Sequence, residues 1–308
     1  MSDCIVHWGD ARKITRIEGE IGGVITLLGE SAGTDRAGLR RVQLEPGMRS
    51  SAAHTHGAEE EIFFIFGGSG LLWEGGKTCE VREGDCIVHL AGGKAHTLRA
   101  GNDGLDVLAF GTRVPVGLVY LPRAGKSFAG VTTFESASMS HPWKHDAAEG
   151  PLEFPEPGPR PGHVVALANS PERIVEKGET RVRARMIGKV AASKRSELNH
   201  FVIEAGARSW PQHCHSAEEE IFVILDGEGV LVLGDDEYPV RRGHVVSRPA
   251  GTGVAHTFRA GKSDLTFLAY GTREPNDIVY YPKSGKVFLR GVGVIGRLEP
   301  LDYWHGEE

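Results

Sequence analysis

The stretch EPGMRSSAAHTHGAEEEIFFIFGGSGLLW, residues 45–73, decides the fold because the chain contains it twice. The second copy, EAGARSWPQHCHSAEEEIFVILDGEGVLV, spans residues 204–232 and aligns with the first without a gap. The segment 95–113 likewise matches 255–273, and VYLPRAGKSFAG from residue 119 matches VYYPKSGKVFLRG from residue 279. A repeat this long has the length of a domain and not of a solenoid unit. The sequence therefore predicts a tandem duplication of one whole fold.

Each copy carries the pattern of a β protein. The segments EIFFIF (61–66) and EIFVIL (220–225) are short, rich in aromatic and β-branched residues, and followed by glycine-containing turn signals. More stretches of strand length follow with glycines between them, and no amphipathic helix longer than two turns is evident. Many short strands with regularly spaced turns predict an all-β sandwich or closed barrel.

The segment between the copies differs in composition from both. HPWKHDAAEGPLEFPEPGPRPGH, which begins at His141, is rich in proline and glycine and has no periodicity, as is typical of a linker. The 308 residues are enough for two domains of about 150 residues each. We predict an N-terminal barrel over residues 1–140, a linker over 141–162 and a C-terminal barrel over 163–308.

Histidines in each copy have the spacing of metal ligands. His54 and His56 are two residues apart in an extended segment, so both side chains point to the same face. The glutamates 59–61 follow, and a carboxylate that faces an apolar interior is costly to bury unless it is paired or metal-bound. His96 arrives after the next glycine-rich turn, and the second copy repeats the pattern.

These residues are where the chain resembles the cupin superfamily. The first cupin motif reads GMRSSAAHTHGAEEEIFFIFGG from Gly47 and GARSWPQHCHSAEEEIFVILDG from Gly206. The second reads GDCIVHLAGGKAH from Gly84 and GHVVSRPAGTGVAH from Gly243, with Leu90 in place of the usual proline and His244 in place of the aspartate. The resemblance implies two double-stranded β-helix (jelly-roll) barrels, a bicupin, whose barrels pair face to face.

The resemblance also selects one glutamate in each triplet, because the motif's glutamate directly precedes the strand. The other glutamates are then expected in a solvated turn. His89 and His200 have arginine counterparts, Arg248 and Arg41, so we expect ordinary histidines there. The predicted ligands of one divalent transition metal per barrel (Fe, Mn, Ni, Cu or Zn) are His54, His56, Glu61 and His96, then His213, His215, Glu220 and His256.

Alternation along the strands predicts which side chains lie beside each ion. The candidate pocket residues are Ala52, Phe63, Ile65 and Leu98 in the first copy and Pro211, Phe222, Ile224 and Phe258 in the second. Two pairs differ, Ala52 from Pro211 and Leu98 from Phe258, and the first copy has the smaller residue in both. We therefore expect the first barrel to have the roomier pocket.

Composition limits the remaining classes of function. The net charge of −6 is not gathered into blocks, which speaks against nucleic acid and anionic membranes as partners. No apolar run approaches a membrane span, and four cysteines without a paired spacing suit a cytoplasmic protein. We expect a small-molecule ligand, and a homo-oligomer stays open.

Four protein ligands leave coordination positions for a small oxygen-bearing substrate, which favours a catalytic over a structural site. Dioxygenase chemistry is the first hypothesis for this chain. A cupin isomerase or decarboxylase is the alternative, and a non-catalytic protein that binds metal and ligand is the competing class.

Overall fold

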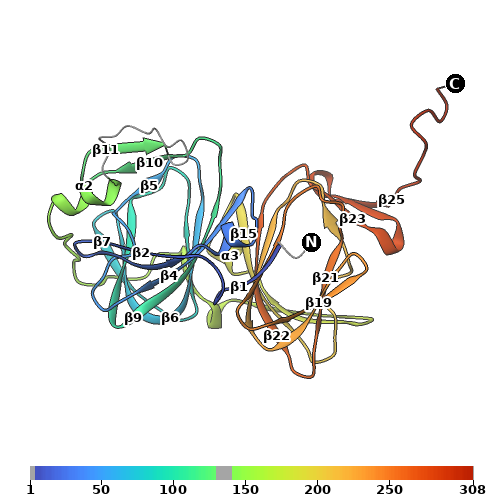
Figure 1. Cartoon of the computed structure of the whole chain (residues 1–308), viewed down its shortest axis with the longest axis horizontal. Coiled ribbons are helices and arrows are strands. Elements are labelled where there is room, and N and C mark those ends of the chain that lie inside the picture. The colour runs from blue at the N-terminus through green and yellow to red at the C-terminus, as the bar shows by residue number, and fades with distance from the viewer. Residues whose placement is uncertain (1–3, 130–140, 308) are drawn as a thin grey trace.

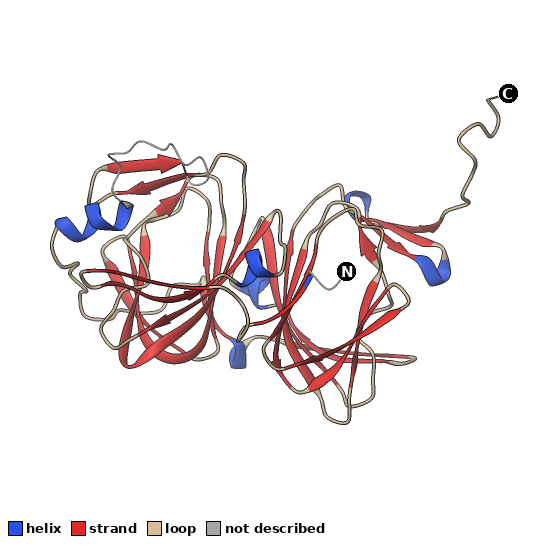
Figure 2. Cartoon of the chain, viewed as in Figure 1, coloured by secondary structure: helices blue, strands red, loops and turns tan. Residues whose placement is uncertain are grey.

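Two β barrels lie side by side, the N-terminal one in blue and green and the C-terminal one in yellow to red (Figure 1). The computed structural model describes residues 4–129 and 141–307. Strands make up nearly all of the regular structure, and the helices are short (Figure 2). The prediction of an all-β fold with two tandem barrels is confirmed.

The N-terminal barrel consists of a large sheet and a small one. The large sheet runs in the order β12-β8-β6-β9-β4-β3-β2 with β7 on β6, and the small sheet in the order β11-β10-β5. Their bounds are β2 (Lys13–Glu18), β3 (Ile21–Thr26), β4 (Ala37–Leu44), β5 (Thr55–His56), β6 (Glu61–Glu74), β7 (Lys77–Arg82), β8 (Asp85–His89), β9 (His96–Thr112), β10 (Leu118–Leu121), β11 (Lys126–Ala129) and β12 (Val164–Ala166).

The C-terminal barrel repeats this arrangement. Its large sheet runs β1-β20-β17-β22-β15-β14-β13, with smaller sheets β19-β18-β21 and β16-β23-β24-β25. Their bounds are β1 (Ile5–His7), β13 (Glu172–Lys177), β14 (Thr180–Arg185), β15 (Ser196–Ile203), β16 (Cys214–His215), β17 (Glu220–Asp226), β18 (Glu228–Leu233), β19 (Asp236–Arg241), β20 (His244–Arg248), β21 (His256–Ala260), β22 (Leu265–Thr272), β23 (Ile278–Tyr281), β24 (Lys286–Leu289) and β25 (Val294–Arg297).

Short helices connect the strands. None in the described part of the chain has the length and apolar character needed to cross a membrane. Their bounds are α1 (Leu28–Ser31), α2 (Pro142–Ala148), α3 (Ile187–Val190), η2 (Leu167–Asn169), η3 (Pro282–Ser284) and η4 (Arg290–Val292).

The alternation expected for the strand after the His-x-His motif is present in both barrels. On β6, Phe63 and Ile65 point into the barrel and join its core, while Ile62 and Phe64 point to the opposite face. That opposite face is covered by the other barrel, where Phe110 stacks on Tyr270 with ring centroids 5.3 Å apart. The barrels therefore pair face to face within one chain and share one apolar interface.

Two crossing strands exchange between the barrels. β1, at the start of the chain, pairs antiparallel with β20 of the C-terminal barrel. β12, which leads into the second copy, pairs antiparallel with β8 of the N-terminal barrel. Each large sheet thus ends in a strand that precedes the other copy in sequence: β1 in the C-terminal barrel and β12 in the N-terminal barrel. These strands cover β20 and β8, which would otherwise be edge strands.

The glutamate triplets do not lie in solvated turns as expected. Glu60 is fully buried at the interface, and its carboxylate accepts hydrogen bonds from the hydroxyls of Ser193 and Ser196, both at 2.6 Å. The carboxylate of Glu219, from the C-terminal barrel, likewise accepts hydrogen bonds from the backbone N–H groups of Asp35 and Ala37 in the N-terminal barrel, both at 2.9 Å. The expectation failed because each carboxylate is satisfied by the other barrel, which lies more than a hundred residues away in sequence.

The segment 141–162 is in contact with the N-terminal barrel. It starts with α2 and continues without regular structure, and the carbonyl of Pro155 accepts a 2.6 Å hydrogen bond from the Thr78 hydroxyl. Arg160 donates two hydrogen bonds to Asp85, at 2.6 and 2.8 Å. This segment therefore carries the chain across the first barrel to β12.

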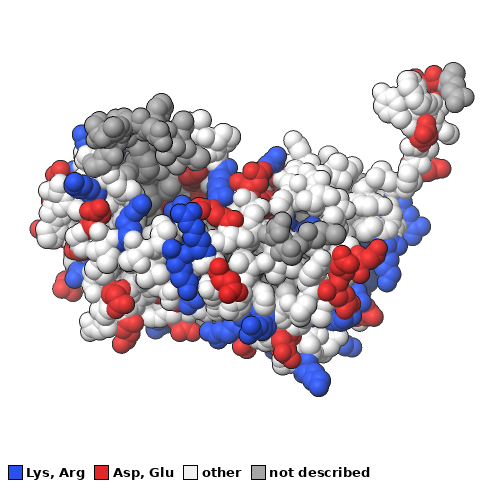
Figure 3. All heavy atoms as spheres, viewed as in Figure 1, with Lys and Arg blue, Asp and Glu red and all other residues white. Residues whose placement is uncertain are grey.

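Lysines and arginines are mingled with acidic residues over the face of the molecule in Figure 3. That distribution matches a sequence without blocks of one charge.

Candidate metal centres

The donor atoms of the first predicted ligand set converge inside the N-terminal barrel. The Oε2 atom of Glu61 lies 3.0 Å from the Nε2 atom of His96, 3.2 Å from that of His56 and 3.7 Å from that of His54. His54 and His56 flank Thr55 at the start of β5, Glu61 opens β6 and His96 opens β9. The four side chains thus come from three neighbouring segments at one end of the barrel.

The second set has the same arrangement. The Oε2 atom of Glu220 lies 3.1 Å from the Nε2 atom of His256 and 3.5 Å from that of His215. Ligand atoms of His213, Glu220 and His256 all lie within 4.8 Å of one another, as do those of His54, His56 and Glu61. The structure therefore brings together all eight residues that the sequence singled out, four in each barrel.

The hydrogen bonds of the imidazoles fit a cation in each cluster. In His54 and His213 the Nδ1–H group donates to a backbone carbonyl, that of Ala52 and Pro211 respectively, at 2.8 Å. Because those protons sit on Nδ1, each neutral ring directs the lone pair of Nε2 into the cluster. The Nε2 atoms of His54 and His56 are only 3.1 Å apart, and two such lone pairs need a cation between them.

Burial and charge act in opposite directions on these groups. Burial lowers the pKa of His96 to about 3 and that of His213 to about 4. For Glu61, burial opposes the charged form, yet the charge of His56 and the hydrogen bonds of the imidazoles hold its pKa well below the usual value. Without a metal, the positive charge next to Glu61 is that of His56, whose own pKa Glu61 and Glu59 raise to about 10 against the effect of burial. A divalent cation would supply the same positive charge with His56 neutral.

The two centres differ in what orients the second histidine of the motif. His56 Nδ1 lies 2.9 Å from a carboxylate oxygen of Glu59. In the second barrel, His215 Nδ1 donates instead to Asp277, at 2.7 Å. Asp277 takes the repeat position of Gly117, where a Cβ atom would lie only 3.1 Å from the Glu59 carboxylate.

Because Asp277 contacts His215, Glu218 does not take the role that its counterpart Glu59 has with His56. Its side chain is buried, forms an ion pair with Arg290, and lies within reach of the same cluster as His215 and Asp277. Sequence reasoning assigned Glu218 to a turn. The signal that could have found it was the Gly117 to Asp277 difference between the copies, which shows that the two glutamates have different partners.

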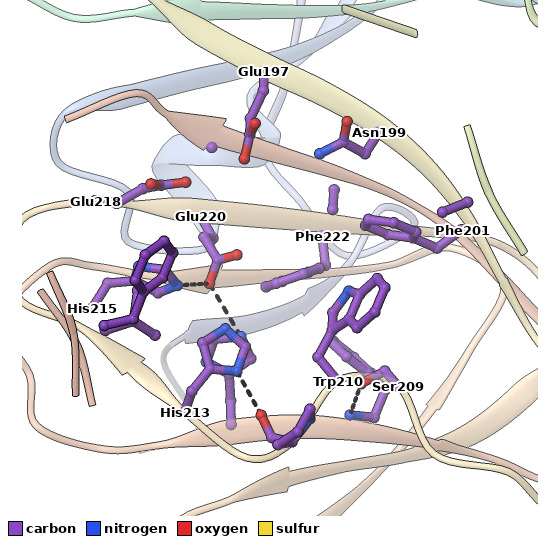
Figure 4. A pocket seen from close by; sticks show the side chains of 18 of the residues that line it. Glu197, Asn199, Phe201, Ser209, Trp210, His213, His215, Glu218, Glu220 and Phe222 are labelled. Carbon is purple, nitrogen blue, oxygen red and sulfur yellow. Dashed lines mark hydrogen bonds and ion pairs between the residues drawn. The ribbon is translucent and has the colours of Figure 1, made fainter. Parts of the chain in front are cut away.

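A cavity of about 350 Å³ opens onto the second centre. His213, His215, Glu220 and Phe222 line it (Figure 4). His256, Phe258 and Pro211 are also among the lining residues. Trp210 also lines it. Ile224, predicted as a fourth pocket residue, instead lies in the barrel core.

This cavity is in the barrel opposite to the one expected to be roomier. The space beside Ala52 is filled by Ile21 and Leu121, which pack on it. On the other side, the His89 ring stacks on His96 with a centroid distance of 3.5 Å, next to Leu98 and Phe63 in the core. Side chains from other strands therefore occupy room beside the two smaller residues.

The cupin domain family matches residues 40–110 and 199–270, one match in each barrel. A comparison with curated proteins gives no significant match. Among solved structures, an oxalate decarboxylase of Bacillus subtilis superposes with a TM-score of 0.60 at 17% identity, covering 90% of this chain and 79% of that one. The Lactobacillus farciminis oxalate decarboxylase in its formate complex gives a TM-score of 0.59 at 16% identity, covering 89% and 87%.

The two barrels, their motifs and these matches define the class of protein. The chain belongs to the cupins as a tandem cupin, or bicupin, with a metal-binding cluster of histidines and glutamates in each barrel.

Proposed function

We propose that this bicupin is a metal-dependent enzyme whose reaction takes place in the C-terminal barrel, on a small oxygen-bearing organic anion. The observation that supports this is the cavity of about 350 Å³ that joins the His213, His215, Glu220 and His256 cluster. A site buried on several sides with an ion at its base is the usual form of a small-molecule site. The volume is at the lower end of the range of small-molecule sites.

The charges of the cavity favour an anion. Its cationic side chains are Arg173, Lys286 and Arg290, and its carboxylates are Glu197, Glu218 and Glu220. These six charges cancel, so a divalent cation held by the neutral histidines and Glu220 makes the cavity positive. An anionic substrate is therefore attracted to the ion and excludes water as it binds.

The bound ion would act as a Lewis acid that polarises an oxygen atom of the substrate. The chain itself supplies a group for proton transfer, because Glu218 is buried at the cavity wall and unused by the ligand histidines. Arg290 reaches both Glu218 and, at 3.7 Å, Glu197, so it holds the Glu218 carboxylate toward the cavity. His215 is oriented by Asp277, which leaves Glu218 available.

Proton transfer beside the ion favours decarboxylase or isomerase chemistry over the dioxygenase hypothesis. In a decarboxylation the carbon–carbon bond breaks, CO₂ leaves, and the electron pair that stays on carbon takes up a proton. The Glu218 carboxylate would first take this proton from the acid form of the substrate or from water and then pass it to the carbon atom. In an isomerisation the same carboxylate removes a proton from one carbon atom and returns it to the next. Manganese is the metal to test first, because the Bacillus subtilis enzyme that shares the fold is described with Mn(II) centres.

The test is a panel of oxalate, diketones and catechols with the Mn(II)-loaded protein, following CO₂ release, product formation and oxygen uptake together. Once a substrate is found, Glu218→Gln should lower turnover by about 100-fold or more, the usual range for a general acid or base, with metal content unchanged. The matched variant is Glu59→Gln in the other barrel, which should keep turnover within about tenfold of the wild type. Stoichiometric oxygen uptake would restore the dioxygenase hypothesis, and ligand binding without turnover would show a non-catalytic protein.

A further inference from the structure

A third cluster of metal-type ligands lies in the N-terminal barrel, beside the first centre but separate from its donors. It consists of Glu74 at the end of β6, His89 at the end of β8, and His163 just before β12. The Oε1 atom of Glu74 lies 3.1 Å from the Nε2 atom of His163 and 3.4 Å from the Nδ1 atom of His89. Ligand atoms of the three residues all lie within 4.8 Å of one another.

The nitrogen atoms of this buried cluster lie close to the Glu74 carboxylate but form no aligned hydrogen bond. The His89 side chain is 3% exposed, yet neither its Nδ1 nor its Nε2 atom has a partner of hydrogen-bond geometry. The Nε2 atom of His163 is likewise without one. A buried imidazole that faces a carboxylate and a second imidazole without an aligned hydrogen bond has the position of a metal ligand. His163 is 27% exposed, which gives an ion a route from solvent.

The second barrel meets the same need in another way. In the repeat, Glu74 corresponds to Leu233 and His89 to Arg248. The pairing of the crossing strands gives Cys4 on the strand β1 side the position that His163 has next to β12. Arg248 is 7% exposed and donates to the carbonyl of Val254 at 2.7 Å. The C-terminal barrel thus carries a permanent cation at the position where the N-terminal barrel carries two imidazoles and a carboxylate.

We propose that Glu74, His89 and His163 bind a divalent transition ion, with zinc as the representative, in addition to the ions of the two cupin centres. Two imidazoles and one carboxylate are a common ligand set for such an ion, with further positions taken by water. The ion ties β12 to the N-terminal barrel, because His163 belongs to the crossing segment and its carbonyl also accepts the Val88 N–H at 3.1 Å. This site is independent of the function proposed above.

The experiment counts zinc bound to the full chain after removal of all metal, reloading and gel filtration, by mass spectrometry. The wild type should bind three equivalents, and Glu74→Gln and His163→Asn two each. Glu80→Gln is the matched control, since Glu80 is exposed on neighbouring β7, and it should keep three equivalents. Crystals of the zinc-loaded wild type should show an anomalous peak among the Glu74, His89 and His163 side chains.

Two equivalents in the wild type with no such peak would overturn the proposal, as would three equivalents retained in both variants. If Glu74→Gln fails to fold, the more exposed His163→Asn decides alone. His56→Ala/His215→Ala removes one ligand from each cupin centre, and it should still show the peak at the third site. Loss of the peak in that variant would mean that the third site depends on the cupin centres, and would contradict the proposal.

Discussion

The two barrels hold the same ligand set in different surroundings. In the N-terminal barrel, Glu59 orients His56, and His89 packs on His96. In the C-terminal barrel, Asp277 orients His215 and a cavity opens beside the cluster. The difference teaches that a duplicated metal site can diverge in its supporting residues while its ligands stay the same.

This comparison also suggests different roles for the two metal centres, one in holding the fold together and one in chemistry. The first centre lies next to the crossing segment, which suits binding that holds the fold together, whereas the second adjoins a cavity and the Glu218 carboxylate, which suits chemistry. The predictions below test that division, in order of the size of the expected effect.

Removing one ligand from each centre gives the largest contrast. His213→Ala should lower turnover by more than about 100-fold, because loss of a ligand exceeds the loss caused by removing a residue that only supports one. His54→Ala should keep turnover within about tenfold of the wild type and instead lower metal content by one equivalent. Steady-state kinetics with metal analysis of both variants measures this. Loss of turnover in His54→Ala with retention in His213→Ala would assign the reaction to the first barrel.

The interface gives the second contrast. Glu60 accepts hydrogen bonds from two buried hydroxyls and from backbone N–H groups of the other barrel, and Glu219 from backbone N–H groups only. Glu60→Ala should therefore lower the free energy of unfolding by about 3 kcal/mol and Glu219→Ala by about 2 kcal/mol, since each leaves buried donors unpaired. Urea unfolding measures both, with exposed Glu45→Ala as the control. Equal losses at all three positions would contradict the reciprocal interface.

The ligand clusters and the paired barrels could be predicted from the sequence because their signals are local or repeated. His54 and His56 share a face by strand geometry alone, and the second copy repeats them in register. The alternation of Phe63 and Phe64 likewise separates the barrel interior from the interface. Such features depend on residues that are close in sequence, where period and spacing carry the information.

What the sequence did not show depends on contacts between distant segments. From the sequence alone, Glu60 is one of three consecutive glutamates before a strand. Only the fold shows that Ser193, far away in sequence, donates a hydrogen bond to it. His163 reads as the end of a linker until β12 pairs with β8. The expectation of a roomier first barrel likewise left out Leu121 and His89, which reach the neighbourhood of the first centre from other strands.

The smallest expected effect concerns His200 on β15, whose counterpart in the N-terminal barrel is Arg41. Burial lowers the pKa of His200 to about 4, whereas its value in the unfolded chain is about 6.5. Above pH 6.5 the residue is neutral in both states, so its protonation does not reduce the free energy of unfolding. As the pH falls from 6.5 toward 4, the unfolded chain binds a proton that the folded chain does not, so the free energy of unfolding decreases. Urea unfolding of metal-free wild type and His200→Gln at pH 7 and pH 5 should show the wild type losing about 1 to 2 kcal/mol more between the two values. Equal losses would mean that His200 is protonated as readily in the folded protein as in the unfolded chain.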